Sequence, residues 1–149
     1  KCKKERLVLF CRGEIFPDFI NLLPPIVIFA AMKKIYHLGT CTTSQAIIKE
    51  TAIDKKGFVM QDIKVEKITP AQLDEMKKMA GSYEALFSRR AIKYKEWGLK
   101  EKILNEKDYR QFILEEYTFL KRPVVIINDQ IFIGSEKKNV EELKKKLEK

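Results

Sequence analysis

The sequence predicts an α/β fold: a four-stranded mixed sheet with a helical insertion between strands 2 and 3. A strand, a helix and a second strand follow one another near the start, and this order implies a right-handed parallel crossover. A β-branched run and its neighbour, separated by Asn128-Asp129, indicate a terminal hairpin. The predicted strands are residues 33–38, 58–63, 123–127 and 130–134, and the predicted helices are residues 43–55, 69–80, 105–117 and 137–147.

Local signals mark the ends of these helices. Lys55-Lys56-Gly57 combines basic residues with a glycine, which favours a helix C-terminus. Thr69-Pro70 supplies an N-cap and a proline at the first helical position. Asn105 or Glu106 opens a helix whose apolar residues recur every three or four positions, and Ser135-Glu136 precede the last helix. The apolar stripe of the 105–117 helix is typical of a core face, not of a cofactor site.

Composition places the chain among ordinary globular proteins. Its 149 residues are 45% hydrophobic and 34% charged, enough for one domain with a sizeable core. A net charge of +9 favours anionic partners, such as phosphate-like oxyanions, glutathione, acidic protein faces or nucleic acid. The lysines are scattered beside glutamates, as on a solvated surface, and no aromatic-basic module is present. We therefore predict no direct nucleic-acid binding.

Residues 1–31 differ from the rest of the chain. Their apolar run is interrupted by prolines, Asp18 and Asn21, so it does not read as a membrane span of about 20 apolar residues. Phe29-Ala30-Ala31 is a weak cleavage-like pattern of a secretory signal. Met32-Lys33-Lys34-Ile35 has the character of a protein start. We predict that residues 1–31 are an extension added by a misplaced start codon, with a signal or anchor as the alternative, and that residues 32–149 form the domain.

The cysteines are Cys2, Cys11 and Cys41. Their number is odd, their spacing does not match a metal site, and the chain has one histidine, so no metal is expected. A single thiol in the body of the domain suits a reducing compartment. The predicted location is the cytoplasm, without membrane association.

Cys41 is the main candidate for chemistry. It follows a loop at Gly39 and precedes Thr42-Thr43-Ser44, which are N-cap residue types, so it sits at or just before a helix N-terminus. Thiols in such positions have pKa values of about 3.5–7.5 instead of about 8.5. His37 could assist if it is protonated and close. The alternative is that Cys41 is a small buried apolar residue and His37 a solvated one.

The segment Tyr36-His37-x-x-x-Cys41-x-Thr43-Ser44 resembles the start of the glutaredoxin-coupled arsenate reductases. This family belongs to the thioredoxin superfamily and also contains the Spx transcription regulators. Leu86-Phe87-Ser88-Arg89-Arg90-x-x-x-Tyr94 resembles the family's anion-binding segment, and Arg122-Pro123 resembles its arginine and cis-proline pair. The resemblance covers residues 33–148 and implies a thioredoxin-like fold.

The resemblance also implies residue roles. Cys41 would be the nucleophile, Arg90 and Arg122 would bind the substrate, and four residues would support them: His37, Thr43, Ser44 and Pro123. No cofactor would be bound, and glutathione or a glutaredoxin would supply electrons. On the residues alone, Arg89 and Arg90 would read as a solvated helix end.

This chain departs from the family pattern at two places. Leu38-Gly39 replaces the usual Asn-Pro, and Gly134 stands where arsenate reductases carry a third arginine. We expect arsenate reduction to be weak unless another cation takes that place. Ser44 occupies the second position of a C-x-x-C pair, so the site has one thiol.

Three functions remain open at this point. The first is a thiol oxidoreductase acting on a small oxyanion or a glutathione adduct. The second is an Spx-like, redox-responsive regulator that binds RNA polymerase. The third is a glutathione-dependent thiol transferase.

Overall fold

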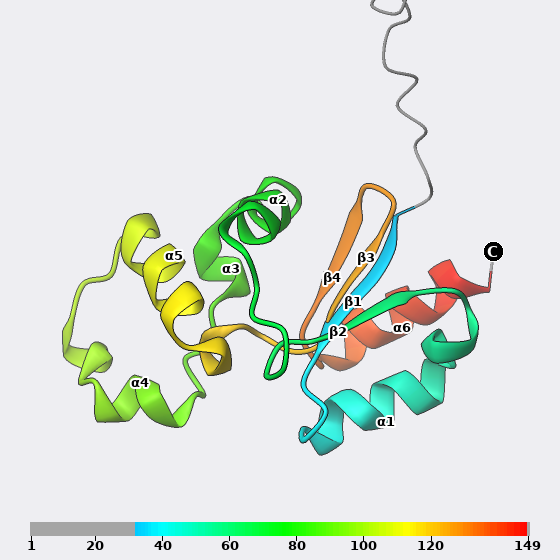
Figure 1. The fold of residues 1–149 in the computed structure, drawn as a ribbon, viewed down its shortest axis with the longest axis horizontal. Helices are drawn as coiled ribbons and strands as arrows, with labels where there is room; N and C mark the ends of the chain where they lie inside the picture. Colours follow the sequence, from blue (N-terminus) through cyan, green and yellow to red (C-terminus); the bar gives the residue numbers. More distant parts are fainter. Residues whose placement is uncertain (1–31, 149) are drawn as a thin grey trace, which may run out of the picture.

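The computed structural model describes residues 32–148, and the predicted extension at residues 1–31 lies outside them. Four strands form one sheet: β1 (Lys33–His37), β2 (Val59–Asp62), β3 (Val124–Ile127) and β4 (Gln130–Ile133). Their order is β2-β1-β3-β4, with β1 and β2 parallel and both other pairs antiparallel (Figure 1). The predicted mixed sheet with its terminal hairpin is confirmed.

Helices fill the connections. They are α1 (Thr42–Thr51), α2 (Pro70–Ala80), α3 (Tyr83–Leu86), α4 (Ile92–Glu96), α5 (Glu106–Glu115) and α6 (Lys137–Leu147), with 3-10 turns η1 (Ile53–Lys55), η2 (Leu99–Glu101) and η3 (Tyr117–Phe119). Helices α2 to α5 lie between β2 and β3 in the sequence and form the predicted insertion, which stands beside the sheet (Figure 1). Within residues 32–148 no helix is both long and apolar enough to span a membrane.

Side-chain caps explain two helix starts. The Thr69 hydroxyl accepts from Gln72 N–H while the Gln72 side chain accepts from Thr69 N–H, a complete capping box. Asn105 and Asp108 form the same reciprocal pair at α5. Each pair satisfies backbone donors that a helix leaves unpaired, a contribution of about 1 kcal/mol.

The first helix ends earlier than the sequence predicted. We expected it to run to Lys55 before Gly57, but α1 stops at Thr51 because Ala52 adopts a left-handed conformation at φ 49°. The chain then makes the 3-10 turn that buries Ile53 completely. Burying an isoleucine contributes about 1.5–3 kcal/mol, more than the roughly 1–2 kcal/mol that one left-handed residue costs.

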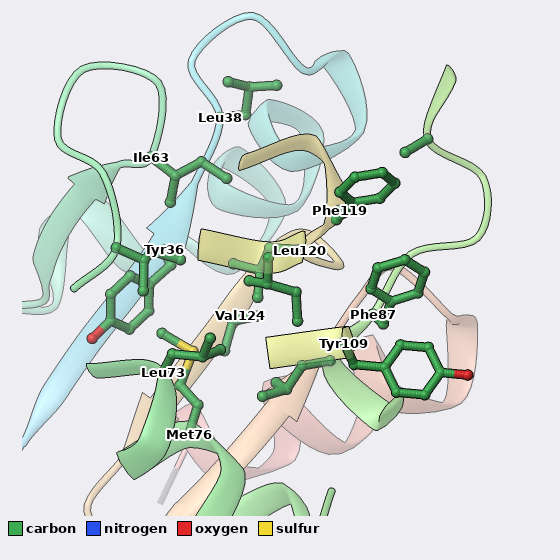
Figure 2. Packing of buried hydrophobic residues seen from close by; sticks show 14 of the residues in the cluster. Tyr36, Leu38, Ile63, Leu73, Met76, Phe87, Tyr109, Phe119, Leu120 and Val124 are labelled. Atoms are coloured by element: carbon green, nitrogen blue, oxygen red, sulfur yellow. The ribbon is translucent and has the colours of Figure 1, made fainter. Parts of the chain in front are cut away.

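The sheet separates two apolar clusters. Ile35 faces α1 and α6, where it packs with Ile47, Ile48 and Leu143. The next residue, Tyr36, points to the opposite face and joins the cluster built mainly by the insertion. Figure 2 shows this larger cluster, in which residues of the insertion meet Val124 of β3 and Ile63 after β2. The alternation along β1 therefore attaches both layers to the sheet.

One contact region fixes the insertion next to the end of β3. The ring of Phe87 stacks on Phe119 at 5.0 Å between centroids (Figure 2). Phe87 also pairs with Leu120 in an isolated antiparallel bridge. Two backbone bonds close this pairing, from Ser88 N–H to Phe119 C=O (2.6 Å) and from Lys121 N–H to Leu86 C=O (2.8 Å). The segments that carry the predicted anion-binding arginines are thus held side by side.

Candidate active site

The turn between β1 and α1 presents Cys41. Its N–H donates to the C=O of Leu38 at 2.9 Å, which closes the turn. Cys41 is itself the N-cap of α1, with extended backbone angles of φ −91° and ψ 110°. No side chain caps α1 by a hydrogen bond, and its first turn contains no acidic residue. The N-terminus of α1 therefore has no acidic residue in its own first turn to face its positive end, and an ionised Cys41 would supply a negative charge there.

The pKa of Cys41 is lowered from its ordinary value. Partial burial raises the pKa of the thiol, but donors to the thiolate outweigh this effect: the N–H and hydroxyl of Ser44, the charge of Arg122 and the N–H of Thr43. Thr43 and Ser44 are the second and third residues of α1, the positions whose N–H groups an N-cap acceptor binds. A thiolate at Cys41 thus takes the place of the usual aspartate or serine cap.

A cavity of about 540 Å³ opens in front of the sulfur. Four parts of the chain form its wall: the start of α1, α3 with the segment after it, the segment before β3, and the end of β4 with the residues that follow. The lining residues are Cys41, Thr43, Glu84, Phe87, Ser88, Arg89, Arg90, Lys121, Arg122, Ile133, Gly134, Ser135 and Glu136. The volume lies within the roughly 300–1,000 Å³ of small-molecule sites.

Four of the predicted site residues line this cavity together. They are Cys41, Thr43, Arg90 and Arg122. Arg90 is exposed and Arg122 half-buried, and neither makes an ion pair with an acidic residue of the described chain. Both guanidinium groups are therefore available to an anion that reaches the sulfur.

The remaining three predicted residues, His37, Ser44 and Pro123, are buried and do not line the cavity. Ser44 is fully buried under the start of α1. His37 is also buried, and its Nδ1 has no hydrogen-bond partner among the described residues. Pro123 is buried and follows a cis peptide bond, as the resemblance predicted. Of these three residues, only Ser44 lowers the pKa of the Cys41 thiol.

Sequence reasoning did not assign four charged residues of the cavity. Arg89 donates to Glu84 at 2.6 Å and to the Tyr109 hydroxyl at 3.2 Å, so its charge is already paired. Lys121 has no ion-pair partner among the described residues. Glu136 is the N-cap of α6, yet its side chain makes no cap hydrogen bond. For Lys121, its position directly before Arg122 was the one sequence feature that could have indicated a place in the cavity.

Gly134 lies on the same wall. Its N–H donates to the C=O of Pro123 at 2.8 Å, and its backbone has φ 81°, a conformation that favours glycine. An arginine at this position would be strained whatever room it had. The backbone conformation at position 134 therefore favours the glycine that this chain has, in place of the arginine of the family pattern.

A second cavity, of about 640 Å³, lies between the hairpin and α6. Its lining contains Met79, Ile131 and Phe132 together with charged residues of α6, and it contains neither a thiol nor an arginine. The chemistry predicted from the sequence therefore belongs to the cavity at Cys41.

A family model places this arrangement among known proteins. The model of the ArsC family matches residues 36–143, which include Cys41, Arg90 and Arg122. The chain belongs to the ArsC family. No curated protein sequence matches the chain.

Solved structures agree with the fold of the ArsC family. An ArsC family related protein from Bacteroides fragilis is 20% identical, with a TM-score of 0.65 over 76% of this chain and 98% of its own. The arsenate reductase from Vibrio cholerae is 23% identical, with a TM-score of 0.61 over 76% and 98%. An ArsC-related protein from Brucella melitensis is 18% identical, with a TM-score of 0.59 over 76% and 94%. The fold is thioredoxin-like, and membership of the ArsC family supports a thiol oxidoreductase.

Proposed function

We propose that this chain is a thiol-dependent oxidoreductase whose nucleophile is the Cys41 thiolate, and that Arg90 and Arg122 hold an anionic, oxidised substrate. One observation carries the proposal: Cys41, the N-cap residue of α1, lines the same cavity as Arg90 and Arg122. The lowered pKa increases the fraction of Cys41 that is thiolate at a given pH, and the arginines would bring an anion to it.

With arsenate as substrate, the Cys41 sulfur attacks arsenic(V) and forms an S–As bond while one oxygen leaves as water. The thiolate of glutathione, or of a glutaredoxin-like protein, then attacks the Cys41 sulfur. The S–As bond breaks and its electron pair reduces arsenic to arsenite, while a mixed disulfide forms on Cys41. A further thiol displaces Cys41 as thiolate and completes the disulfide. Cys41 is the one cysteine among the described residues, and in this proposal the reductant is an external thiol.

A second substrate class is favoured by the shape and charge of the cavity. A volume of about 540 Å³ exceeds what a compact oxyanion fills, and Glu136 adds a negative charge on the Gly134 side. A glutathione mixed disulfide suits such a wall, since the peptide carries both carboxylates and an ammonium group. Cys41 would attack the glutathione sulfur of the mixed disulfide, form a disulfide with glutathione, and release the partner thiol. A second glutathione would then free Cys41 and leave glutathione disulfide.

The test measures arsenite and glutathione disulfide formed by the purified protein with glutathione and either arsenate or a mixed disulfide. We expect Cys41→Ser to abolish both reactions. Arg122→Ala should lower kcat/KM for arsenate about 10- to 100-fold, since one charge-assisted anchor is worth roughly 1.5–3 kcal/mol. Lys100→Ala, which removes an exposed cation of η2 outside the cavity, is the control. Turnover that survives Cys41→Ser contradicts the proposal.

A further inference from the structure

The carboxylate of Asp62 connects the end of β2 to the turn that carries Cys41. Its Oδ2 accepts from Gly39 N–H at 3.0 Å, across 23 positions of sequence, and its Oδ1 accepts from Lys64 N–H at 3.0 Å. Asp62 is also paired in the sheet with His37, where β1 ends. Its position is therefore set by the sheet and by its own following turn.

Position 39 requires glycine because of this contact, and not because of the backbone angles at that position. The other described glycines, Gly57, Gly81, Gly98 and Gly134, all have positive φ and open space around them. Gly39 has no positive φ, but a Cβ at this position would lie 2.5 Å from Asp62 Oδ2. A side chain at Gly39 would therefore push the carboxylate away from the N–H that it binds.

Hydrogen bonds hold the turn on both sides of Gly39. Its N–H is bound to β2 through Asp62, and its C=O accepts from Gln45 Nε2 of α1 at 3.4 Å. The preceding C=O, of Leu38, accepts from the N–H of Cys41. The backbone of Cys41 is thus fixed relative to the first turn of α1, whose N–H groups stabilise the thiolate.

We infer that Asp62 is a positioning residue for Cys41, which acts through Gly39 to keep the sulfur at the cap of α1. This inference rests on the proposed function. The alternative, a purely electrostatic role, has the opposite sign. Loss of a nearby negative charge by itself favours the thiolate, whereas loss of the positioning contact disfavours it.

The experiment is a double-mutant cycle on Gly39→Ala and Asp62→Ala, read by iodoacetamide alkylation of Cys41 against pH in a Cys2→Ser/Cys11→Ser background. Each single variant should slow alkylation at pH 7 at least about fivefold. The two changes remove one contact, so the double variant should be within about twofold of Asp62→Ala. Substrate kinetics should show the loss mainly in kcat, because Asp62 does not line the cavity.

Three controls make the cycle decisive. Thr40→Ala changes the same turn, and Asp54→Ala removes an exposed carboxylate elsewhere, so neither should alter alkylation. Asp62→Asn keeps the shape and one acceptor oxygen, and should fall between the native protein and Asp62→Ala. It replaces Asp62→Ala in the cycle if that variant does not fold.

The outcomes separate this inference from the proposed function. Faster alkylation in Asp62→Ala, an unchanged rate, or losses that multiply in the double variant would each overturn the positioning role. A native Cys41 that alkylates no faster than a free thiol would instead overturn the proposed function, and with it this inference.

Discussion

Replacing Ser44 with alanine removes one donor from the Cys41 thiolate and leaves the others in place. The Ser44 hydroxyl is fully buried and has no hydrogen-bond partner among the described residues, and it lowers the pKa of the Cys41 thiol, so we expect it to donate to the sulfur once the thiol ionises. A hydrogen bond to a charged group contributes about 1.5–3 kcal/mol. Because the sulfur is partly exposed to water, we take the low end, about 1.5 kcal/mol, which is roughly tenfold in the thiol–thiolate equilibrium constant.

The assay is alkylation of Cys41 by iodoacetamide as a function of pH, with Cys2 and Cys11 replaced by serine. In Ser44→Ala the rate should fall about tenfold at pH values where the native thiol is still mostly protonated. The two rates should converge at alkaline pH, where both proteins are fully thiolate. Thr42→Ala, an exposed change in the same helical turn, is the matched control. An unchanged or faster rate in Ser44→Ala would refute the account of how this site activates sulfur.

Two further predictions concern stability. A chain that begins at Met32 should melt like the full chain, and a loss of more than about 2 kcal/mol, or several degrees, would mean that residues 1–31 stabilise the domain. Hydrogen bonds from Arg110 and Tyr83 lower the pKa of Asp74 to about 2. The native carboxylate therefore stabilises the fold above about pH 4, and this advantage over Asp74→Asn should disappear as the pH falls from about 4 to 2. A difference in unfolding midpoint that is the same at both ends of this range would contradict the role of the Asp74–Arg110 pair.

The elements that the sequence predicts correctly are those set by local patterns. The buried run at 124–127, the turn at Asn128-Asp129 and the following strand form the predicted hairpin, and Asn128 has the positive φ of such a turn. Cys41 was placed at a helix start from the cap residues beside it, and it is the cap. Local propensity did not reveal the end of α1, because burial of Ile53 decides where the chain turns.

The rest of the candidate site depends on contacts between distant segments. Glu84 and Lys121 reach one cavity because Phe87 pairs with Leu120, and no local pattern encodes that pairing. The contact between Gly39 and Asp62 likewise joins residues that only the parallel crossover brings together. Glu136 lies in the cavity because the chain turns at Gly134. The sequence alone therefore indicated Cys41 as the candidate nucleophile and Arg90 and Arg122 as cations of the site. It did not indicate the other charged residues that line the cavity.

The two apolar clusters on opposite faces of the sheet separate the origins of reactivity and of selectivity. The start of α1, the helix that packs with α6 on one face, lowers the pKa of the Cys41 thiol. Half of the charged residues of the cavity wall, Glu84, Arg89 and Arg90, lie in α3 or just after it, in the insertion whose core is on the other face. Substitutions in the insertion can therefore change which molecule is accepted while the thiolate keeps its reactivity. With this division, substitutions in the insertion could change the substrate while Cys41 remains reactive.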